Sequence, residues 1–201
     1  FLTYEIQPGD NIPAGMKTEI RVLYDEDNIY FGIKCYDTCI TNIRAHICAR
    51  DQIFSDDYIS ITIDPDNNYQ RAYEFAVNPY GIQGDLVYTA PSSEDSSYDM
   101  LWYSAATIEQ DGRSAELRIP FNAFDFPEAE VQEWTMVLAR NIPRENRILN
   151  SWTKMHRDNP NWVSDGGFIR GIESIHSGKS ISVIPYSLLY LNSSRMDQSE
   201  L

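Results

Sequence analysis

Basic residues, cysteines and long apolar runs are all scarce in this chain of 201 residues, and each scarcity excludes a class of protein. Only 16 lysines and arginines accompany 30 aspartates and glutamates, which gives a net charge of -14. So negative a surface repels phosphate backbones and anionic lipids, and this excludes sequence-independent binding to nucleic acid. No apolar run reaches the roughly 18 residues of a transmembrane helix, because the best one, 181–191, is interrupted by Ser182, Pro185 and Ser187.

The three cysteines, Cys35, Cys39 and Cys48, are too few and odd in number for a disulfide framework. One pair, such as Cys39 with Cys48, remains possible. Their spacing, without clustered histidines, does not fit a zinc site. Cys35 ends an alternating apolar series, which is typical of a small buried side chain. A globular chain of this length can bury its own core without disulfide or metal staples.

Alternation of apolar and polar residues with a period of two dominates the chain and predicts strands with one buried face. Helical periodicity is limited to short turns near 121–126 and 40–49. We therefore expect an all-β fold, an antiparallel β-sandwich of jelly-roll-like type with roughly ten strands in a single domain. The odd-numbered residues from Ile29 to Cys35 should point inward. The alternation is clearest at 19–24, 29–35, 59–63, 73–77, 102–108, 115–119 and 134–138.

Two stretches, 90–101 and 141–167, lack a strand pattern and are expected to be long loops. Loops longer than about 12 to 15 residues in a compact domain are usually functional or disordered. Large aromatic side chains such as Trp152 and Trp162 in a polar loop favour a binding surface. The second stretch is also locally basic, through Arg144, Arg147, Lys154 and Arg157.

The many carboxylates include adjacent pairs such as Asp56 and Asp57, and two carboxylates flanking a bond are the machinery of glycoside hydrolysis. Adjacent acids in a strand point to opposite faces, however, so we do not expect a catalytic pair here. The three histidines also lie apart from any nucleophile motif such as G-x-S-x-G. The sequence therefore predicts no catalytic residues.

The segment 64–68, Asp-Pro-Asp-Asn-Asn, places hard oxygen ligands at alternating positions, as the start of a calcium loop would. Tyr69 stands where an EF-hand needs glycine, and Phe75 where it needs the bidentate glutamate. We favour a solvated turn. The alternative is a structural calcium ion bound between loops by Asp64 or Asp66, and no other cofactor is expected.

Several segments in a fixed order carry a likeness to a known family. The chain resembles the family 9 carbohydrate-binding modules over roughly residues 16–175, and in particular the version at the front of large bacterial outer-membrane proteins. The segments are TEIRVLYD at 18–25, IYFGI at 29–33, FSDDYISITID at 54–64, YEFAVNPYG at 73–81 and ELRIP at 116–120.

This resemblance implies a β-sandwich of the DOMON-like type and a non-catalytic role in which a sugar is held between two aromatic side chains. Phe54 and Trp162 match the two clamp positions, and Asn159 matches a polar residue that precedes the second one. Trp152, in the same loop, is expected to assist. The ligand is therefore expected to be a carbohydrate.

Three positions depart from the family's sugar-binding pattern. Ser60 and Ala76 stand where sugar-binding members have charged hydrogen-bonding residues, and Val137 lies about where they have an amide. Stacking without such partners should give weak, broad binding. The basic residues of 141–167 favour acidic glycans over neutral ones. The alternative is a structural or interaction domain that caps an outer-membrane barrel and whose sugar site has decayed.

The resemblance also implies a setting and a division of the chain. The protein should be secreted and face the periplasm or cell surface, attached to the outer membrane in its parent protein, with its own C-terminal membrane β-barrel as a partner. Residues 1–175 should form the carbohydrate-binding-module-like sandwich, with one strand preceding Phe1. Residues 176–201 should add a final strand and a linker toward a following domain.

Overall fold

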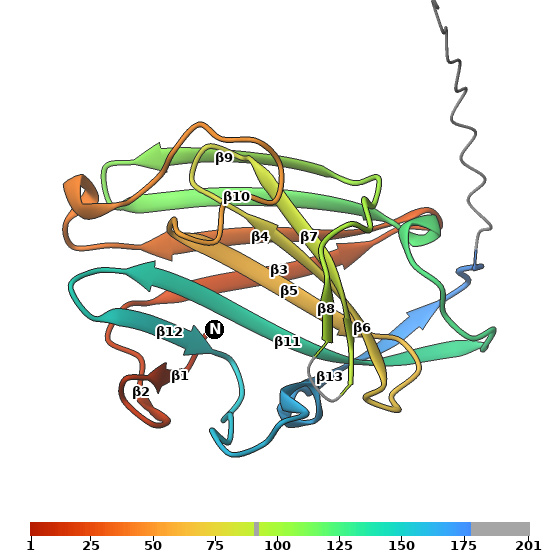
Figure 1. Cartoon of the computed structure of the whole chain (residues 1–201). Coiled ribbons are helices and arrows are strands. Elements are labelled where there is room, and N and C mark those ends of the chain that lie inside the picture. The colour runs from red at the N-terminus through yellow and green to blue at the C-terminus, as the bar shows by residue number, and fades with distance from the viewer. Residues whose placement is uncertain (91–92, 178–201) are drawn as a thin grey trace, which may run out of the picture.

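A computed structural model describes residues 1–90 and 93–177 of the chain. Two antiparallel β-sheets pack face to face (Figure 1). The all-β prediction is confirmed, since the described residues contain strands and three short 3-10 helices, Ile40–Asn42 (η1), Phe121–Ala123 (η2) and Trp162–Asp165 (η3). Within residues 1–90 and 93–177, no helix is long and apolar enough to cross a membrane. The final strand expected near 181–186 lies outside the described residues.

The smaller sheet has four strands in the order β3, β4, β10, β9, with bounds Thr18–Tyr24, Asn28–Tyr36, Gly112–Pro120 and Tyr103–Glu109. The turn between β3 and β4 forms because the Asp25 carboxylate accepts the backbone N–H groups of Asp27 (2.9 Å) and Asn28 (2.8 Å). This acidic turn therefore joins β3 and β4 in a hairpin.

The larger sheet has nine strands, in the order β2, β1, β12, β11, β5, β6, β7, β8, with β13 paired beside β11. One of its faces packs on the smaller sheet and the other faces solvent. In this order the strand bounds are Ile12–Pro13, Tyr4–Gln7, Arg147–Ser151, Val131–Pro143, Tyr58–Asp64, Arg71–Val77, Gln83–Thr89, Ser93–Asp95 and, for β13, Gly167–Glu173.

The core lies between the two sheets, and the alternating pattern places its residues there. Ile29, Phe31, Ile33 and Cys35 are all buried, which confirms the predicted inward face. Trp134 is fully buried against Phe121, Phe124 and Phe126. Trp102 is buried edge-on to Phe75, with ring centroids 5.5 Å apart. Both tryptophans therefore belong to the core.

The pairing of β11 explains how a loop reaches the open face of the larger sheet. One edge of β11 pairs with β12 along residues 139–143 and with β13 along residues 131–136. The chain between these two partners, residues 152–166, must therefore leave the sheet at the break and return to it. Trp152 fills the break, because its backbone N–H donates to Leu138 O (3.3 Å) and its indole N–H donates to Met136 O (3.1 Å).

Several sequence expectations need correction. The stretch 141–167 is not one loop, because β11 runs on to Pro143 and β12 follows it. The stretch 90–101 includes β8, a three-residue strand. The turn expected at 40–49 shortens to η1. All three cysteine thiols are free, so the Cys39–Cys48 pair is not formed.

Candidate functional site

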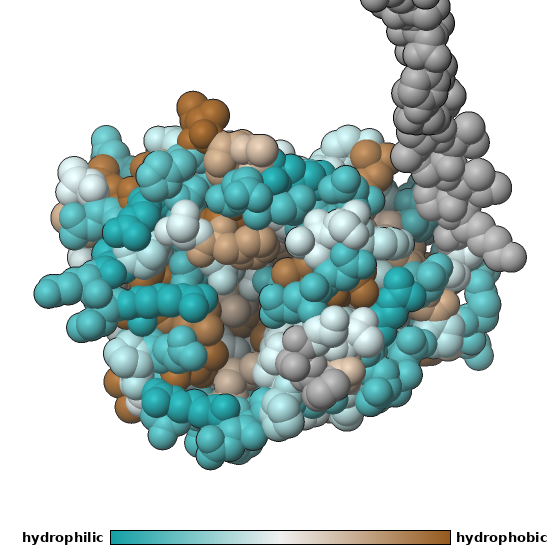
Figure 2. Space-filling model, in the orientation of Figure 1, coloured by the Kyte–Doolittle hydropathy of each residue, from teal (hydrophilic) through white to brown (hydrophobic). Residues whose placement is uncertain are grey.

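A hollow with a cavity volume of about 390 Å³ opens on the solvent-facing side of the larger sheet. In Figure 2 this side is recessed near the middle of the view, with apolar residues inside a largely hydrophilic rim. The size falls within the range of ordinary ligand pockets. Its lining comprises Ile6, Gln7, Tyr58, Ser60, Thr62, Glu74, Glu94, Val137, Ala139, Leu149, Ser151, Met155, His156, Arg157, Asn159 and Trp162.

The floor is hollow because small residues face outward where three central strands meet. In β5, the isoleucines at 59, 61 and 63 point to the core, so Ser60 and Thr62 must point to the open face. Ala139 lies opposite Ser60 and Val137 lies opposite Thr62 across the β5–β11 pair. Short side chains on neighbouring strands therefore leave a depression in the sheet surface.

The wall of the hollow carries Trp162, which η3 holds at the end of the loop 152–166. Its ring packs edge-on against Tyr88, with centroids 5.2 Å apart. The Asn161 side chain fixes the loop from below by donating to Tyr69 O at 2.8 Å. Trp162 is only partly buried, so part of the indole remains available at the hollow.

Glu74 lies on the floor of the hollow and was not expected from the sequence. It faces outward from β6, opposite Thr62, because Tyr73, Phe75 and Val77 face the core. The hydroxyl groups of Ser60 and Thr62 lie beside its carboxylate and act to lower its pKa. Burial raises the pKa of Glu74 to about 7, and the charge of Glu94 adds to the rise. The signal that could have found it is the alternation of β6, in which position 74 must point to the face opposite the core residues at 73, 75 and 77.

Phe54 lies beside the hollow rather than in its lining. Its ring meets the ring of Tyr58 edge-on, with centroids 5.4 Å apart. A side chain at Gly84 would meet Ile53 at 3.0 Å and Phe54 at 3.2 Å, so this glycine lets both cover the sheet. Phe54 and Trp162 pack against the same small apolar cluster, which comprises Ala72, Leu86, Tyr88 and Val163. The structure thus brings both predicted clamp residues to one face, but only Trp162 lines the hollow.

The other two predicted ligand residues have different positions. Asn159 lines the hollow, and its amide also shapes the loop, donating to Ser164 Oγ (2.9 Å) and accepting from Asn161 N–H (3.0 Å). Trp152 does not line the hollow. It packs against the core cluster, and a side chain at Gly167 would lie 2.6 Å from its ring. Trp152 is therefore a structural residue at the break in the sheet.

Of the three positions that depart from the sugar-binding pattern, two line the hollow and one does not. Ser60 and Val137 line the hollow, so the missing polar groups would have been there. Ala76 is fully buried in a small cluster with Ile53 and Tyr58, outside the lining. Glu74, one outward position along β6 from Ala76, supplies a charged group to the same hollow.

The basic residues of the stretch 141–167 mostly have partners elsewhere. Arg144 pairs with Asp57 (2.7 Å) and Asp37 (2.8 Å). Arg147 donates to Asn141 Oδ1 at 2.5 Å, and Lys154 lies 5.6 Å from the centroid of the Tyr4 ring. Only Arg157 of the four lines the hollow. The positive charge that favoured acidic glycans therefore does not converge on this site.

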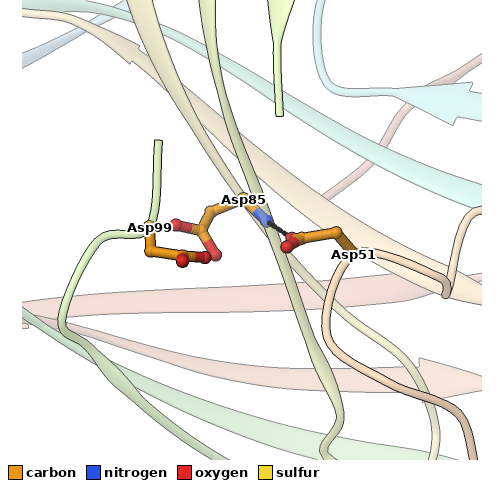
Figure 3. A group of neighbouring side chains, drawn as sticks. All are labelled: Asp51, Asp85 and Asp99. Atoms are coloured by element: carbon orange, nitrogen blue, oxygen red, sulfur yellow. Dashed lines mark hydrogen bonds between the residues drawn. The ribbon is translucent and has the colours of Figure 1, made fainter. Parts of the chain in front are cut away.

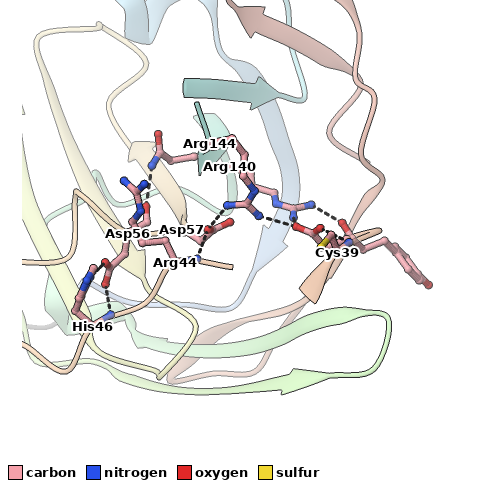
Figure 4. Close-up of polar contacts among 10 residues, drawn as sticks. Cys39, Arg44, His46, Asp56, Asp57, Arg140 and Arg144 are labelled. Carbon is pink, nitrogen blue, oxygen red and sulfur yellow. Dashed lines mark hydrogen bonds and ion pairs between the residues drawn. The ribbon is translucent and has the colours of Figure 1, made fainter. Parts of the chain in front are cut away.

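Asp56 and Asp57 are both fully buried and belong to a structural network directly before the first residue of β5 (Figure 4). Asp56 accepts the backbone N–H of His46 at 3.0 Å and an amide proton of Asn78 at 3.0 Å. Asp57 accepts the backbone N–H of Arg44 at 2.8 Å. With Arg144 occupying Asp57, neither carboxylate is presented to a substrate. We call Asp37, Asp57, Arg140 and Arg144 the acid–arginine cluster.

The predicted calcium residues form a turn. Both oxygens of the buried Asp64 carboxylate accept backbone N–H groups, from Asp66 at 3.0 Å and Tyr69 at 2.7 Å. The Asp66 side chain is exposed. A calcium ion held by Asp64 or Asp66 stays a prediction.

A second group of acids, Asp51, Asp85 and Asp99, has carboxylate oxygens within 4.8 Å of one another (Figure 3). Protein groups already contact all three acids. Asp51 accepts the Asp85 backbone N–H at 2.8 Å, and Asp85 accepts that of Met100 at 2.7 Å. Arg50 pairs with Asp85 and lies 3.4 Å from Asp99. We assign no metal to this group.

Comparison with solved structures places the sandwich among known folds. A protein from Bacteroides uniformis ATCC 8492, provisionally named as carbohydrate-binding, superposes with a TM-score of 0.61 at 13% identity, covering 77% of this chain and 78% of that one. A family 9 carbohydrate-binding module from Caldicellulosiruptor kristjanssonii in complex with cellotriose gives a TM-score of 0.56 at 14% identity, with 88% and 83% covered. The same organism's module with glucose gives 0.54 at 14% identity, with 87% and 83% covered. At such identities the likeness shows the fold.

The sequence itself provides the family. No curated protein matches it. The family described as carbohydrate family 9 binding domain-like, however, matches residues 4–158, which is most of the chain and includes β1 to β12. The chain therefore belongs to the carbohydrate family 9 binding domain-like family.

Proposed function

We propose that this domain is a non-catalytic module that binds a sugar in the hollow of the larger sheet. The observation that carries the proposal is the position of Trp162, a partly exposed indole on the wall of a hollow whose floor offers a carboxylate and two hydroxyls. Indole faces stack on the C–H face of sugar rings, and polar floor groups bond sugar hydroxyls. Membership of a carbohydrate-binding family supports this reading.

In this arrangement one ring stacks on Trp162 and its hydroxyls turn toward Glu74, Ser60 and Thr62. Stacking on an aromatic side chain contributes on the order of 1 to 3 kcal/mol, by analogy with nucleobases. One stacking residue and few polar partners leave a dissociation constant on the order of millimolar once association costs are met. The expected binding is weak and broad across neutral glucans and related glycans.

Isothermal titration with cellotriose and a panel of oligosaccharides tests the proposal. We expect Trp162→Ala to weaken binding about tenfold or more, the equivalent of the stacking energy. Tyr103→Ala is the matched control, because Tyr103 is an exposed aromatic of the smaller sheet, away from the hollow. Absence of binding to any glycan at about ten millimolar, or unchanged binding in Trp162→Ala, would overturn the proposal.

The non-catalytic part has its own test, since a hollow with two carboxylates invites a search for hydrolysis. We expect prolonged incubation with cellotriose and other oligosaccharides to release no shorter products by chromatography. Release of products that disappears in Glu74→Gln would contradict a purely binding role.

We further propose the cellular location that the family resemblance implies. The chain is a DOMON-like module that is secreted and faces the periplasm or cell surface. Its parent protein attaches it to the outer membrane. Cell fractionation with an antibody to this domain tests this proposal. Recovery of the domain in the cytoplasmic fraction would contradict it.

An interaction domain remains the second candidate, and a separate surface favours it. The outer face of the smaller sheet exposes Leu23 (72%) and Tyr103 (47%) around a shallow hollow of about 470 Å³. Exposed apolar groups gathered on one face favour contact with another protein surface, such as the barrel that the resemblance implies. If Leu23→Ser with Tyr103→Ser loosens the domain from its parent protein while Trp162→Ala changes nothing, this candidate replaces the first.

A further inference from the structure

We propose that the hollow prefers saccharides that carry a free amino group over their neutral counterparts. The inference rests on the proposed sugar binding and names the ligand class of the same site. It reverses the preference for acidic glycans that the basic residues of 141–167 suggested. The charges of the hollow that lack a partner within the protein set this preference.

The two basic residues that line the hollow are held by other groups. Arg157 donates to Pro8 O at 2.6 Å and lies 3.6 Å from Asp10. His156 places Nδ1 3.0 Å from Asp165, which also accepts the His156 backbone N–H at 2.7 Å. Each base therefore faces an acid outside the hollow's lining. Both thus have a carboxylate neighbour before a ligand arrives.

The two acids of the hollow, Glu74 and Glu94, have no such partners. Among the described residues neither forms an ion pair with a lysine, arginine or histidine. The groups that influence the Glu74 carboxyl are its own burial, Ser60, Thr62 and Glu94, and none of them is basic. Hydroxyl donors satisfy part of a carboxylate but leave its charge unpaired. The hollow thus holds excess negative charge.

An ammonium group would supply the missing charge and up to three donors. Glu74 sits on the floor and Trp162 on the wall of the same hollow, so a ring stacked on the indole can direct a substituent toward the carboxylate. Charge-assisted hydrogen bonds are roughly twice as strong as neutral ones. We therefore expect an amino saccharide to bind about tenfold more tightly than the neutral sugar with the same backbone.

Titration with three trisaccharides of the same linkage tests the preference at pH 7 and low salt. The probes are cellotriose, the corresponding glucosamine trisaccharide, and its N-acetylated form, in which neutral amides replace the amino groups. We expect the amine to bind about tenfold better than the other two. Glu74→Gln should reduce this advantage to about twofold or less. Glu116→Gln, at an exposed glutamate of β10, should keep it in full.

Proton release gives a second readout. The titratable or charged groups that line the hollow with Glu74 are Tyr58, Glu94, His156 and Arg157. Because burial holds the pKa of Glu74 at about 7, a cation that binds it at pH 6.5 should expel a proton. The binding heat of the amine should therefore depend on the ionisation enthalpy of the buffer, and that of cellotriose should not. Loss of the dependence in Glu74→Gln separates Glu74 from His156.

The outcomes separate this inference from the proposed function. If all three sugars bind equally, or the amine binds more weakly, the preference is wrong while sugar binding stands. If the preference appears but survives Glu74→Gln, the assignment to Glu74 is wrong. If none of the three binds at about ten millimolar, both the inference and the proposed function fail for these ligands.

Discussion

Two groups of carboxylates differ in what surrounds them. In the acid–arginine cluster, the buried Asp57 and Asp37 share Arg144 at 2.7 and 2.8 Å. In the hollow, Glu74 has only hydroxyl partners and a second acid nearby. Charge that the fold itself neutralises holds the loops and strands in place, whereas charge left without a counter-ion is available to a ligand. Counting acids in the sequence cannot separate the two.

Breaking the cluster should have the largest effect on the molecule. Asp57→Ala removes the partner of Arg144 and the acceptor for the Arg44 backbone N–H. Removing one member of a buried ion pair typically costs about 3 to 5 kcal/mol of stability. Urea denaturation should show this loss, while Asp66→Ala, at an exposed turn residue, should change stability little. A loss below about 1 kcal/mol would show that the cluster is not structural.

Removing the unpaired charge of Glu74 should raise the free energy of unfolding, and the size of this gain should depend on pH. The pKa of Glu74 rises from 4.5 to about 7 on folding, so the folded state holds its proton more tightly than the unfolded state. The contribution of Glu74 to the free energy of unfolding is therefore fully present below pH 4.5 and is lost as pH rises through about 7, by up to about 3 kcal/mol. Glu74→Gln escapes this loss.

The measurement is the free energy of unfolding of Glu74→Gln and the unchanged protein at several pH values. We expect the variant to be the more stable at pH 8.5, with the advantage fading toward pH 5. Glu116→Gln should show no such trend. An advantage that does not vary with pH would mean that Glu74 is already neutralised within the fold, and the contrast with the cluster would disappear.

The smallest effect is expected at Asn159, which belongs to both kinds of contact. Its amide lines the hollow and also bonds Ser164 and the Asn161 backbone within the loop. Asn159→Ala should cost about 1 kcal/mol of stability and weaken sugar binding only a few-fold, about threefold. Titration and thermal melts of the same preparation measure both. A loss of binding as large as that of Trp162→Ala would make Asn159 a primary ligand residue.

The fold could be predicted because the alternating pattern reports burial directly. Phe31, Ile61 and Phe75 each sit at an inward position of a strand whose neighbours alternate, and all three are buried. The pattern failed at β12, where Ile148 and Leu149 are adjacent and partly buried. It also failed at β1, whose pairing with β12 joins residues separated by most of the chain. Short edge strands depend on partners that local sequence does not reveal.

The candidate site was only partly predictable. Trp162 and Asn159 were identified and line the hollow, whereas Trp152 was placed with them and belongs to the break in the sheet. Glu74 was not predicted, because the family pattern points to position 76 of β6 and not to position 74, the neighbouring outward position of the same strand. Which carboxylates lack a counter-ion depends on three-dimensional neighbours, and only the structure supplies those.

The divided pairing of β11 also bears on how such a module can be altered. Residues 152–166 connect β12 to β13, and both of these strands pair with β11. The segment that carries Trp162 is thus an insertion between two strands that both pair with β11. Replacing it with the matching segment of another module, while keeping Trp152 to plug the break, offers a route to new sugar preferences without redesigning either sheet.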